Sequence, residues 1–244
     1  MIQVRVLAFG VLKDALGSSA SDLVLPPGAT VADLLSEVAR RHPHARLAGI
    51  AVGVNSEYAQ ANQTLRDGDE VGLLPPVSGG IAPTNSAEDH AALPDRVELT
   101  RNVVDADQLV AAAKRGEDGA VVVFDGIVRD NSRGRRTLHL DYEAYEEMAL
   151  RQMRELAEQA RDRFGVRHVT IIHRLGRLAV GETSVLIVVA SAHRAQAYEA
   201  SRWLIDTLKK TVPIWKKETF VDGAVWADGE PFPSGIGVEA TNAS

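Results

Sequence analysis

The 244-residue sequence contains no cysteine. This absence excludes disulfide bonds, thiolate metal sites and a cysteine nucleophile at once. If the protein handles sulfur, the sulfur must therefore be carried on something other than a side chain.

Long apolar runs and a surplus of positive charge are also missing. No run of about 18 apolar residues occurs, so we expect no membrane span. The N-terminal segment MIQVRVLAFG has the pattern of a strand and lacks the three regions of a signal peptide, which predicts a cytoplasmic protein. A formal net charge of −6 argues against general binding to nucleic acid.

The first 80 residues predict a small domain in the order β-β-α-β-β. Thr30 is a plausible N-cap for its helix, and Leu34, Leu35 and Val38 share one helix face. The expected elements are strands at 2–9, 22–25, 50–54 and 71–74 and a helix at 31–41.

This order, the phrase LRDGDEV at 65–71 and the closing Gly79-Gly80 resemble the ubiquitin-like sulfur carriers. The small subunit of molybdopterin synthase is similar in length and in the tail LLPPVSGG. A glycine pair alone more often marks a turn, so the resemblance depends on the whole of residues 1–80. It implies a β-grasp fold.

Residues 81–96 have prolines, small residues and no periodic apolar pattern, and we interpret them as a linker. A second α+β domain is predicted over residues 97–228. Its expected elements are helices from the Asp105 cap to about 115, at 146–164 and at 195–210, and strands at 138–145, 168–174, 183–190 and 214–221, with a buried strand at 119–128. The Gly, Pro and Ser content of residues 229–244 predicts a mobile tail.

Two basic phrases of the second domain could bind an anion. Arg129 follows an apolar strand, so its side chain must find water or an anion, whereas the other arginines up to Arg136 can form a solvated surface. His193 and Arg194 stand at a predicted helix N-terminus, where free N–H groups suit a phosphate, although simple capping is the alternative. We interpret His173 as a structural histidine, because it follows an apolar strand.

Four lysines and no carboxylate fall between positions 209 and 217. Lys209 is close to a helix C-terminus, where cations are favoured in any case. Lys216 and Lys217 are adjacent in a predicted strand, so one of them should point inward, and desolvation there would depress its pKa. Trp215 is predicted to be a core residue, with a stacking platform as the alternative.

These phrases resemble the large subunit of molybdopterin synthase over about residues 97–228. The match depends on VR at 128–129, SAHR at 191–194 and PIWKKE at 213–218, in that order and behind a domain that ends in Gly-Gly. The family's proline-aromatic-tryptophan phrase has Ile214 at its middle position here, which affects packing more than chemistry. The resemblance implies an α/β hammerhead-type fold for this domain.

The resemblance also implies the site. The catalytic groups would be Lys216, Lys209 and the carrier glycine Gly80, which follows Gly79. No metal and no cofactor are expected. The substrate-binding residues would be Ile127, Val128, Arg129, His193, Arg194, Lys217 and Glu218.

The implied reaction belongs to molybdenum cofactor biosynthesis. An adenylating and sulfurating enzyme would convert the glycine carboxyl to a thiocarboxylate, and two such sulfurs would pass to cyclic pyranopterin monophosphate to give molybdopterin. Arg129, His193 and Arg194 would hold the substrate phosphate. Lys216 would assist attack or elimination, and Lys209 would stabilise negative charge near the glycine carbonyl. The family also implies a homodimer.

The continuous chain presents a difficulty, because Gly80 is joined to Ile81 and has no free carboxyl. Proteolysis after Gly80 could release a working carrier. Alternatively, the intact chain is inactive and the fusion keeps the two products stoichiometric before processing.

Two other classes of function stay open from the sequence. A ubiquitin-like domain could be fused to a non-catalytic adaptor, in which the lysines, Arg129 and His193 would have no reason to converge. A phosphate- or RNA-binding protein could use the loop 129–136, although the loop has no interleaved aromatic residue and the chain is acidic.

Overall fold

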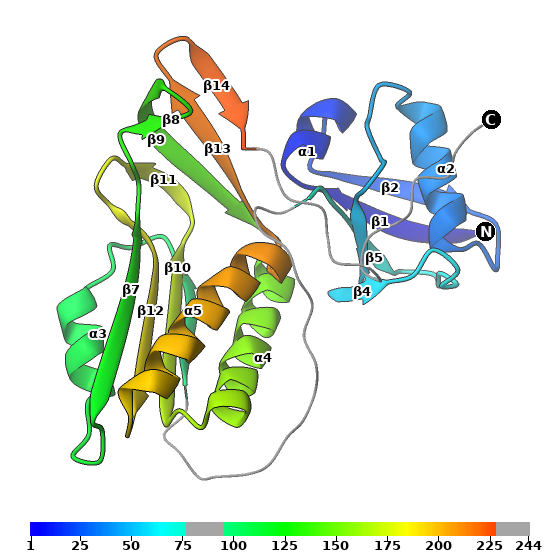
Figure 1. Cartoon of the computed structure of the whole chain (residues 1–244). Coiled ribbons are helices and arrows are strands. Elements are labelled where there is room, and N and C mark those ends of the chain that lie inside the picture. Colours follow the sequence, from blue (N-terminus) through cyan, green and yellow to red (C-terminus); the bar gives the residue numbers. More distant parts are fainter. Residues whose placement is uncertain (77–94, 228–244) are drawn as a thin grey trace.

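The structure is a computed structural model that describes residues 1–76 and 95–227. The predicted carrier glycines Gly79 and Gly80, residues 81–94 of the predicted linker and the predicted tail of 229–244 lie outside these ranges. The described residues form two α+β domains that pack against each other (Figure 1). No helix within these ranges is long and apolar enough to cross a membrane.

The N-terminal domain is a five-stranded sheet with a helix across one face. Its first and last strands, β1 (Ile2–Ala8) and β5 (Glu70–Leu74), are parallel neighbours at the centre. This central parallel pair with its crossing helix is the β-grasp arrangement that the sequence predicted. The sheet order is β2-β1-β5-β3-β4, with β2 (Ala20–Leu25), β3 (Ala51–Val54) and β4 (Glu57–Ala59).

The helix α2 (Val31–Arg41) begins and packs as predicted. Thr30 Oγ1 accepts a hydrogen bond from the Asp33 amide at 3.3 Å, and the Asp33 carboxylate accepts from the Thr30 amide at 2.8 Å. This capping box satisfies N–H groups that the first helical turn leaves free. Leu34 and Val38 lie in the core of the domain.

Two short elements of this domain were not predicted. The helix α1 (Val11–Leu16) ends at Gly17, whose φ of 74° is a left-handed conformation that glycine adopts more readily than other residues. The strand β4 has only three residues. Both are too short for a periodic pattern, and the surrounding packing stabilises them.

The C-terminal domain is built on a four-stranded sheet in the order β6-β10-β12-β7. The helices α4 and α5 cover one face and α3 covers the other (Figure 1). Alternate residues of β12 separate the two cores, because Ile187 and Val189 pack with α4 and α5, whereas Leu186 and Val188 pack with α3. The bounds are β6 (Arg96–Thr100), α3 (Ala106–Ala113), β7 (Ala120–Ile127), α4 (Glu146–Phe164), β10 (His168–Arg174), β12 (Thr183–Ser191) and α5 (Arg194–Thr211).

The strand β7 corrects one prediction, since it is not buried. It lies at the edge of its sheet, and the side chains of Val123 and Ile127 are 41% and 54% exposed. An apolar, β-branched run shows β propensity but does not distinguish an interior strand from an edge strand that meets another surface.

A second sheet extends from the C-terminal domain toward the N-terminal domain (Figure 1). Its strands run in the order β11-β9-β13-β14, and the two-residue strand β8 pairs with β9. Its members are β8 (Asn131–Ser132), β9 (Arg135–Ala144), β11 (Gly176–Ala179), β13 (Ile214–Phe220) and β14 (Gly223–Trp226).

The two domains meet through aromatic side chains. Phe9 stacks between Tyr145 and Trp215, with ring centroids 5.1 Å from each. The Trp215 indole Nε1 donates to the Pro75 carbonyl at 3.0 Å, and the Tyr58 hydroxyl donates to the Thr211 carbonyl at 2.7 Å. Tyr and Trp suit such an interface because each combines a large apolar ring with one hydrogen-bonding group.

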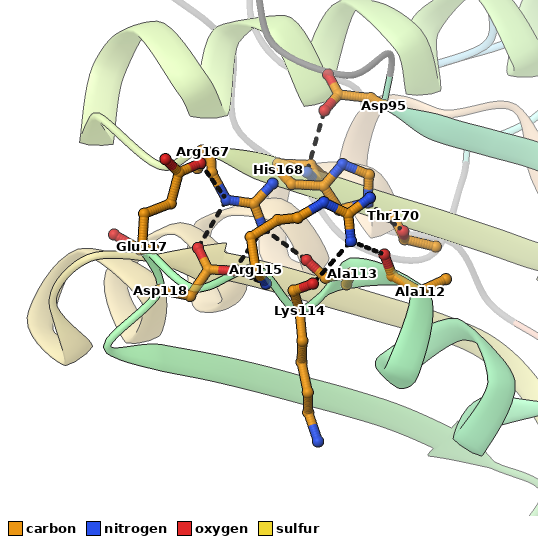
Figure 2. A network of polar contacts seen from close by, with 12 residues as sticks. Asp95, Ala112, Ala113, Lys114, Arg115, Glu117, Asp118, Arg167, His168 and Thr170 are labelled. Atoms are coloured by element: carbon orange, nitrogen blue, oxygen red, sulfur yellow. Dashed lines mark hydrogen bonds and ion pairs between the residues drawn. The ribbon is translucent and has the colours of Figure 1, made fainter.

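A polar network fixes the opposite end of the four-stranded sheet (Figure 2). Arg167 forms an ion pair with Asp118 and donates to the Ala113 carbonyl. Asp95 accepts from the Val169 amide at 3.0 Å and lies 2.9 Å from Arg161 Nε. These contacts hold the start of β6 and the end of α3 on the sheet, so the predicted linker ends before Asp95.

Candidate active site

A cavity of about 590 Å³ lies in the C-terminal domain. Its walls come from both sheets and from the last turns of α5. The charged residues on its walls are Arg129, Asp206, Lys209, Lys210, Lys216 and Glu218.

A helix end and a strand place the two predicted catalytic lysines together. The helix α5 carries Lys209 in its last turn and ends before Pro213, which cannot continue a helix. The chain returns immediately as β13, whose residue Lys216 lines the same cavity. The predicted pair is therefore brought together by a sharp reversal within eight residues.

Alternation along β13 pairs Lys216 with Glu218. Residues two apart in a strand share a face, and Lys216 Nζ lies 3.1 Å from Glu218 Oε1. Burial opposes ionisation of Glu218, but hydrogen bonds from Ser132 and Lys216 outweigh it and lower the pKa of the carboxyl. Glu218 is thus a charged partner that holds the lysine in the cavity.

The sequence predicted a depressed pKa for the inward-pointing member of the pair Lys216 and Lys217, but the lysine whose pKa the surroundings lower is Lys209. Desolvation lowers the pKa of Lys209 first, and the positive charges of Lys216 and Arg129 lower it further. Three cationic groups therefore lie close enough to repel one another, an arrangement that an anionic ligand would relieve.

His173 also belongs to this cavity, although the sequence favoured a purely structural role. Its ring lies on the cavity wall, and its Nδ1 is 2.8 Å from the Arg174 carbonyl oxygen. Burial lowers the pKa of His173 to about 4. The only sequence signal was its place at the end of an apolar strand, which a core histidine shares.

Two predicted substrate-binding residues lie elsewhere. Lys217 faces the N-terminal domain, where its Nζ is 3.8 Å from Asp14 and 5.4 Å from the Trp226 ring. Val128 is buried against Leu140 and Leu178. Both corrections follow from alternation, because each residue adjoins one that does line the cavity.

His193 and Arg194 are separate from the cavity within one chain. They line a hollow of about 350 Å³ with Gly119 at the N-terminus of α5. Fifteen residues of helix separate Arg194 from Lys209, which corresponds to roughly 22 Å at about 1.5 Å per residue. Within one chain, a single phosphate therefore cannot contact Arg129 and these two residues together.

Sequence reasoning missed several polar wall residues. These residues lie on β8, β9, β12 and α5, and only the tertiary fold brings these four elements together around the cavity. They are Asn131, Ser132, Thr137, Tyr142, Ser184 and Asp206.

The fold and site define a class of enzyme in which a β-grasp domain docks beside a cation-lined cavity of an α+β domain. The family model "ThiS family" matches residues 6–80, and the model "MoaE protein" matches residues 99–211. The predicted β-grasp and second α+β domain are thereby confirmed.

Individual proteins agree with the family models. The molybdopterin synthase catalytic subunit of Pyrococcus abyssi is 41% identical over 124 residues, which cover 51% of this chain and 84% of that protein. That of Bacillus subtilis is 38% identical over 132 residues, which cover 54% and 84%. The crystal structure of molybdopterin synthase from Staphylococcus aureus matches with a TM-score of 0.51 and 36% identity over 54% of this chain and 96% of that one.

The chain belongs to the family of molybdopterin synthase catalytic subunits, and it carries a ubiquitin-like sulfur-carrier domain fused in front of the catalytic domain. Its place is in molybdenum cofactor biosynthesis. The convergence of Lys209, Lys216 and Arg129 in one cavity also disfavours the adaptor alternative.

Proposed function

We propose that this chain, once cleaved after Gly80, transfers two sulfurs from glycine thiocarboxylates to cyclic pyranopterin monophosphate. The observation that carries the proposal is the placement of β13. Trp215 binds the Pro75 carbonyl on one side of this strand, and Lys216 lines the cavity on the other. The five residues from Pro75 to Gly80 could span at most roughly 17 Å, and we expect the docked carrier end to enter the cavity over this length.

Each charged residue of the cavity would have a separate role in the reaction. Arg129 would bind the substrate phosphate, because a guanidinium pairs well with phosphate oxygens. Lys209 would hold the negatively charged thiocarboxylate before its sulfur attacks the substrate. It would then stabilise the oxyanion that forms at the Gly80 carbonyl when water cleaves the resulting thioester and releases the Gly80 carboxylate. Lys216, held by Glu218, would move protons in the attack and elimination steps. The released Gly80 carboxyl would require a separate adenylating and sulfurating enzyme.

A homodimer would complete the anion site. The edge strand β7 starts beside Gly119, at the hollow of His193 and Arg194, and ends at Ile127 on the cavity wall. A two-fold axis pairs identical edge strands antiparallel, so the start of one β7 would meet the end of the other. His193 and Arg194 of a second copy would then approach the cavity that contains Arg129.

Complementation tests the shared site. The variants Lys216→Ala and Arg194→Ala should each be inactive alone, because each damages both sites of its dimer. A mixed dimer would contain one site with native Lys216 and native Arg194, so co-refolded chains should regain a substantial fraction of turnover. Continued inactivity of verified mixed dimers would show that both groups act within one chain.

Cleavage is tested by intact-mass spectrometry of protein purified from its native host. A fragment that ends at Gly80, heavier by about 16 Da when sulfur replaces one carboxyl oxygen, is the expected species. Sulfur transfer by a chain with a proven intact Gly80–Ile81 bond would overturn the cleavage requirement.

A further inference from the structure

We propose that His173 is a specificity-determining residue of the cavity, whose Nε2 accepts a hydrogen bond from an N–H or O–H group of the pterin substrate. The inference rests on the proposed function and names a contact that the cationic residues cannot make. Lysine and arginine side chains only donate hydrogen bonds, so they recognise the oxygen atoms of a ligand. Recognition of a ligand's donors requires an acceptor.

The hydrogen bond of His173 to the backbone determines which nitrogen can accept. Nδ1 lies 2.8 Å from the Arg174 carbonyl oxygen, and a carbonyl only accepts. Nδ1 must therefore carry the ring proton and donate it, which leaves Nε2 of the neutral ring with a free lone pair. Among the residues that the structure describes, no group donates to Nε2.

Packing keeps the ring in this orientation. Tyr142 contacts His173 edge-on with ring centroids 5.2 Å apart, and the histidine is only 5% exposed. Because His173 lies on the cavity wall and its Nδ1 is held by the Arg174 carbonyl, we infer that the Nε2 edge faces the space that a ligand would fill. The ring is thus preorganised, and binding would cost little side-chain entropy.

Burial and the nearby charge of Lys209 keep the ring neutral, with a pKa of about 4. At neutral pH the ring is therefore an acceptor at Nε2 and cannot become a second donor. This state also explains how a histidine coexists with three cations without adding a fourth positive charge. A pterin ring offers amino and ring N–H groups, which suit such an acceptor.

Two substitutions separate the cavity contact from the structural one. His173→Asn places an amide N–H near the position of Nδ1, so it can keep the bond to the Arg174 carbonyl while it removes the cavity acceptor. His173→Gln extends its amide toward the position of Nε2 and supplies an acceptor there, but it gives up the Arg174 contact. His139→Asn, at a histidine on β9 that does not line the cavity, is the matched control.

The measurement is the equilibrium dissociation constant of cyclic pyranopterin monophosphate with the full-length chain, which requires no sulfur transfer. We expect His173→Asn to weaken binding about tenfold, the usual size of one lost hydrogen bond, while His173→Gln and His139→Asn bind within about threefold of the parent. Thermal unfolding of each variant checks that the fold is retained.

The outcomes distinguish this inference from the proposed function. Parent-like binding by folded His173→Asn, or an equal loss in the Asn and Gln variants, would overturn the role of Nε2 and leave the synthase proposal standing. Failure of the parent chain itself to bind the pterin would overturn both.

Discussion

The two faces of β13 carry out different tasks with different chemistry. One face presents Lys216 and Glu218 to the cavity, where charges are close together and partly desolvated. The other presents Trp215 and Lys217 to the N-terminal domain. There Trp215 stacks on Phe9, and Lys217 lies near Asp14 at the rim. Strand alternation therefore lets four consecutive positions of 215–218 serve docking and reaction at once.

The difference teaches how docking and chemistry are kept separate. The buried part of the interface contains tyrosines that stay neutral, since burial raises the pKa of Tyr58 and also raises the pKa of Tyr145 to about 12. Ion pairs such as Lys13–Glu143 lie at its partly exposed rim. The cavity depends on groups whose pKa values the surroundings lower, namely Lys209, His173 and Glu218. Changes of charge should accordingly act on the cavity first.

Lys216→Ala should have the largest effect, because it removes the cation that Glu218 holds toward the cavity. We expect turnover of cleaved, sulfurated protein to fall by about a thousandfold, within the range for a lost acid–base group. Single-turnover formation of molybdopterin is the measurement. Docking of the N-terminal domain should not change, and an active, correctly folded variant would contradict the proposed role.

Acid should destabilise the cavity through His173. The pKa of this histidine is about 4 in the folded chain and 6.5 in its unperturbed state, so the unfolded chain binds the extra proton first as pH falls. The contribution of His173 to the free energy of unfolding is therefore constant above pH 6.5. It falls between pH 6.5 and 4, by at most about 3 kcal/mol.

Chemical denaturation over this pH window, in parent and His173→Asn, is the check. Asparagine has no group that binds a proton in this range, so the free energy of unfolding of the variant should fall less steeply between pH 6.5 and 4. Equal slopes would mean that His173 titrates normally in the folded chain. The interface tyrosines stay neutral throughout this window, so they add no slope of their own.

Trp215→Phe tests the other face. The substitution keeps an aromatic ring against Phe9 but removes the donor to the Pro75 carbonyl. An unsatisfied buried carbonyl costs about 2 kcal/mol, or roughly thirtyfold in affinity. Calorimetry of the two fragments produced by cleavage after Gly80 would measure this loss, with Trp203→Phe, between α4 and α5, as the control. Unchanged affinity would show that the tail docks without this bond.

The sequence predicted most of the fold because its long elements follow regular patterns. The helix at 146–164 and the strand at 168–174 have the predicted limits, and Asp105 caps α3 through the Gln108 amide. Periodicity could not show that β7 is an edge strand, because its outer contacts lie beyond its own sequence.

The site was predictable where chain reversal brings residues together, as for Lys209 and Lys216. The predicted helix at 195–210 already puts Arg194 and Lys209 at opposite ends, but only the tertiary fold shows that Arg129 lies with Lys209 and not with Arg194. The state of His173 depends on Tyr142 and on a backbone carbonyl, and neither contact has a sequence signature.

Lys217→Ala should have the smallest effect, and it is the closest control for Lys216 because only the face of the strand differs. The contacts of Lys217 with Asp14 and the Trp226 ring lie at the partly exposed rim of the interface. Such surface pairs contribute less than about 1 kcal/mol and weaken in salt. We expect a slight, salt-sensitive loss of docking affinity and unchanged single-turnover rates. A loss of turnover that approaches the Lys216→Ala value would show that Lys217 reaches the substrate, and the separation of the two faces would then be wrong.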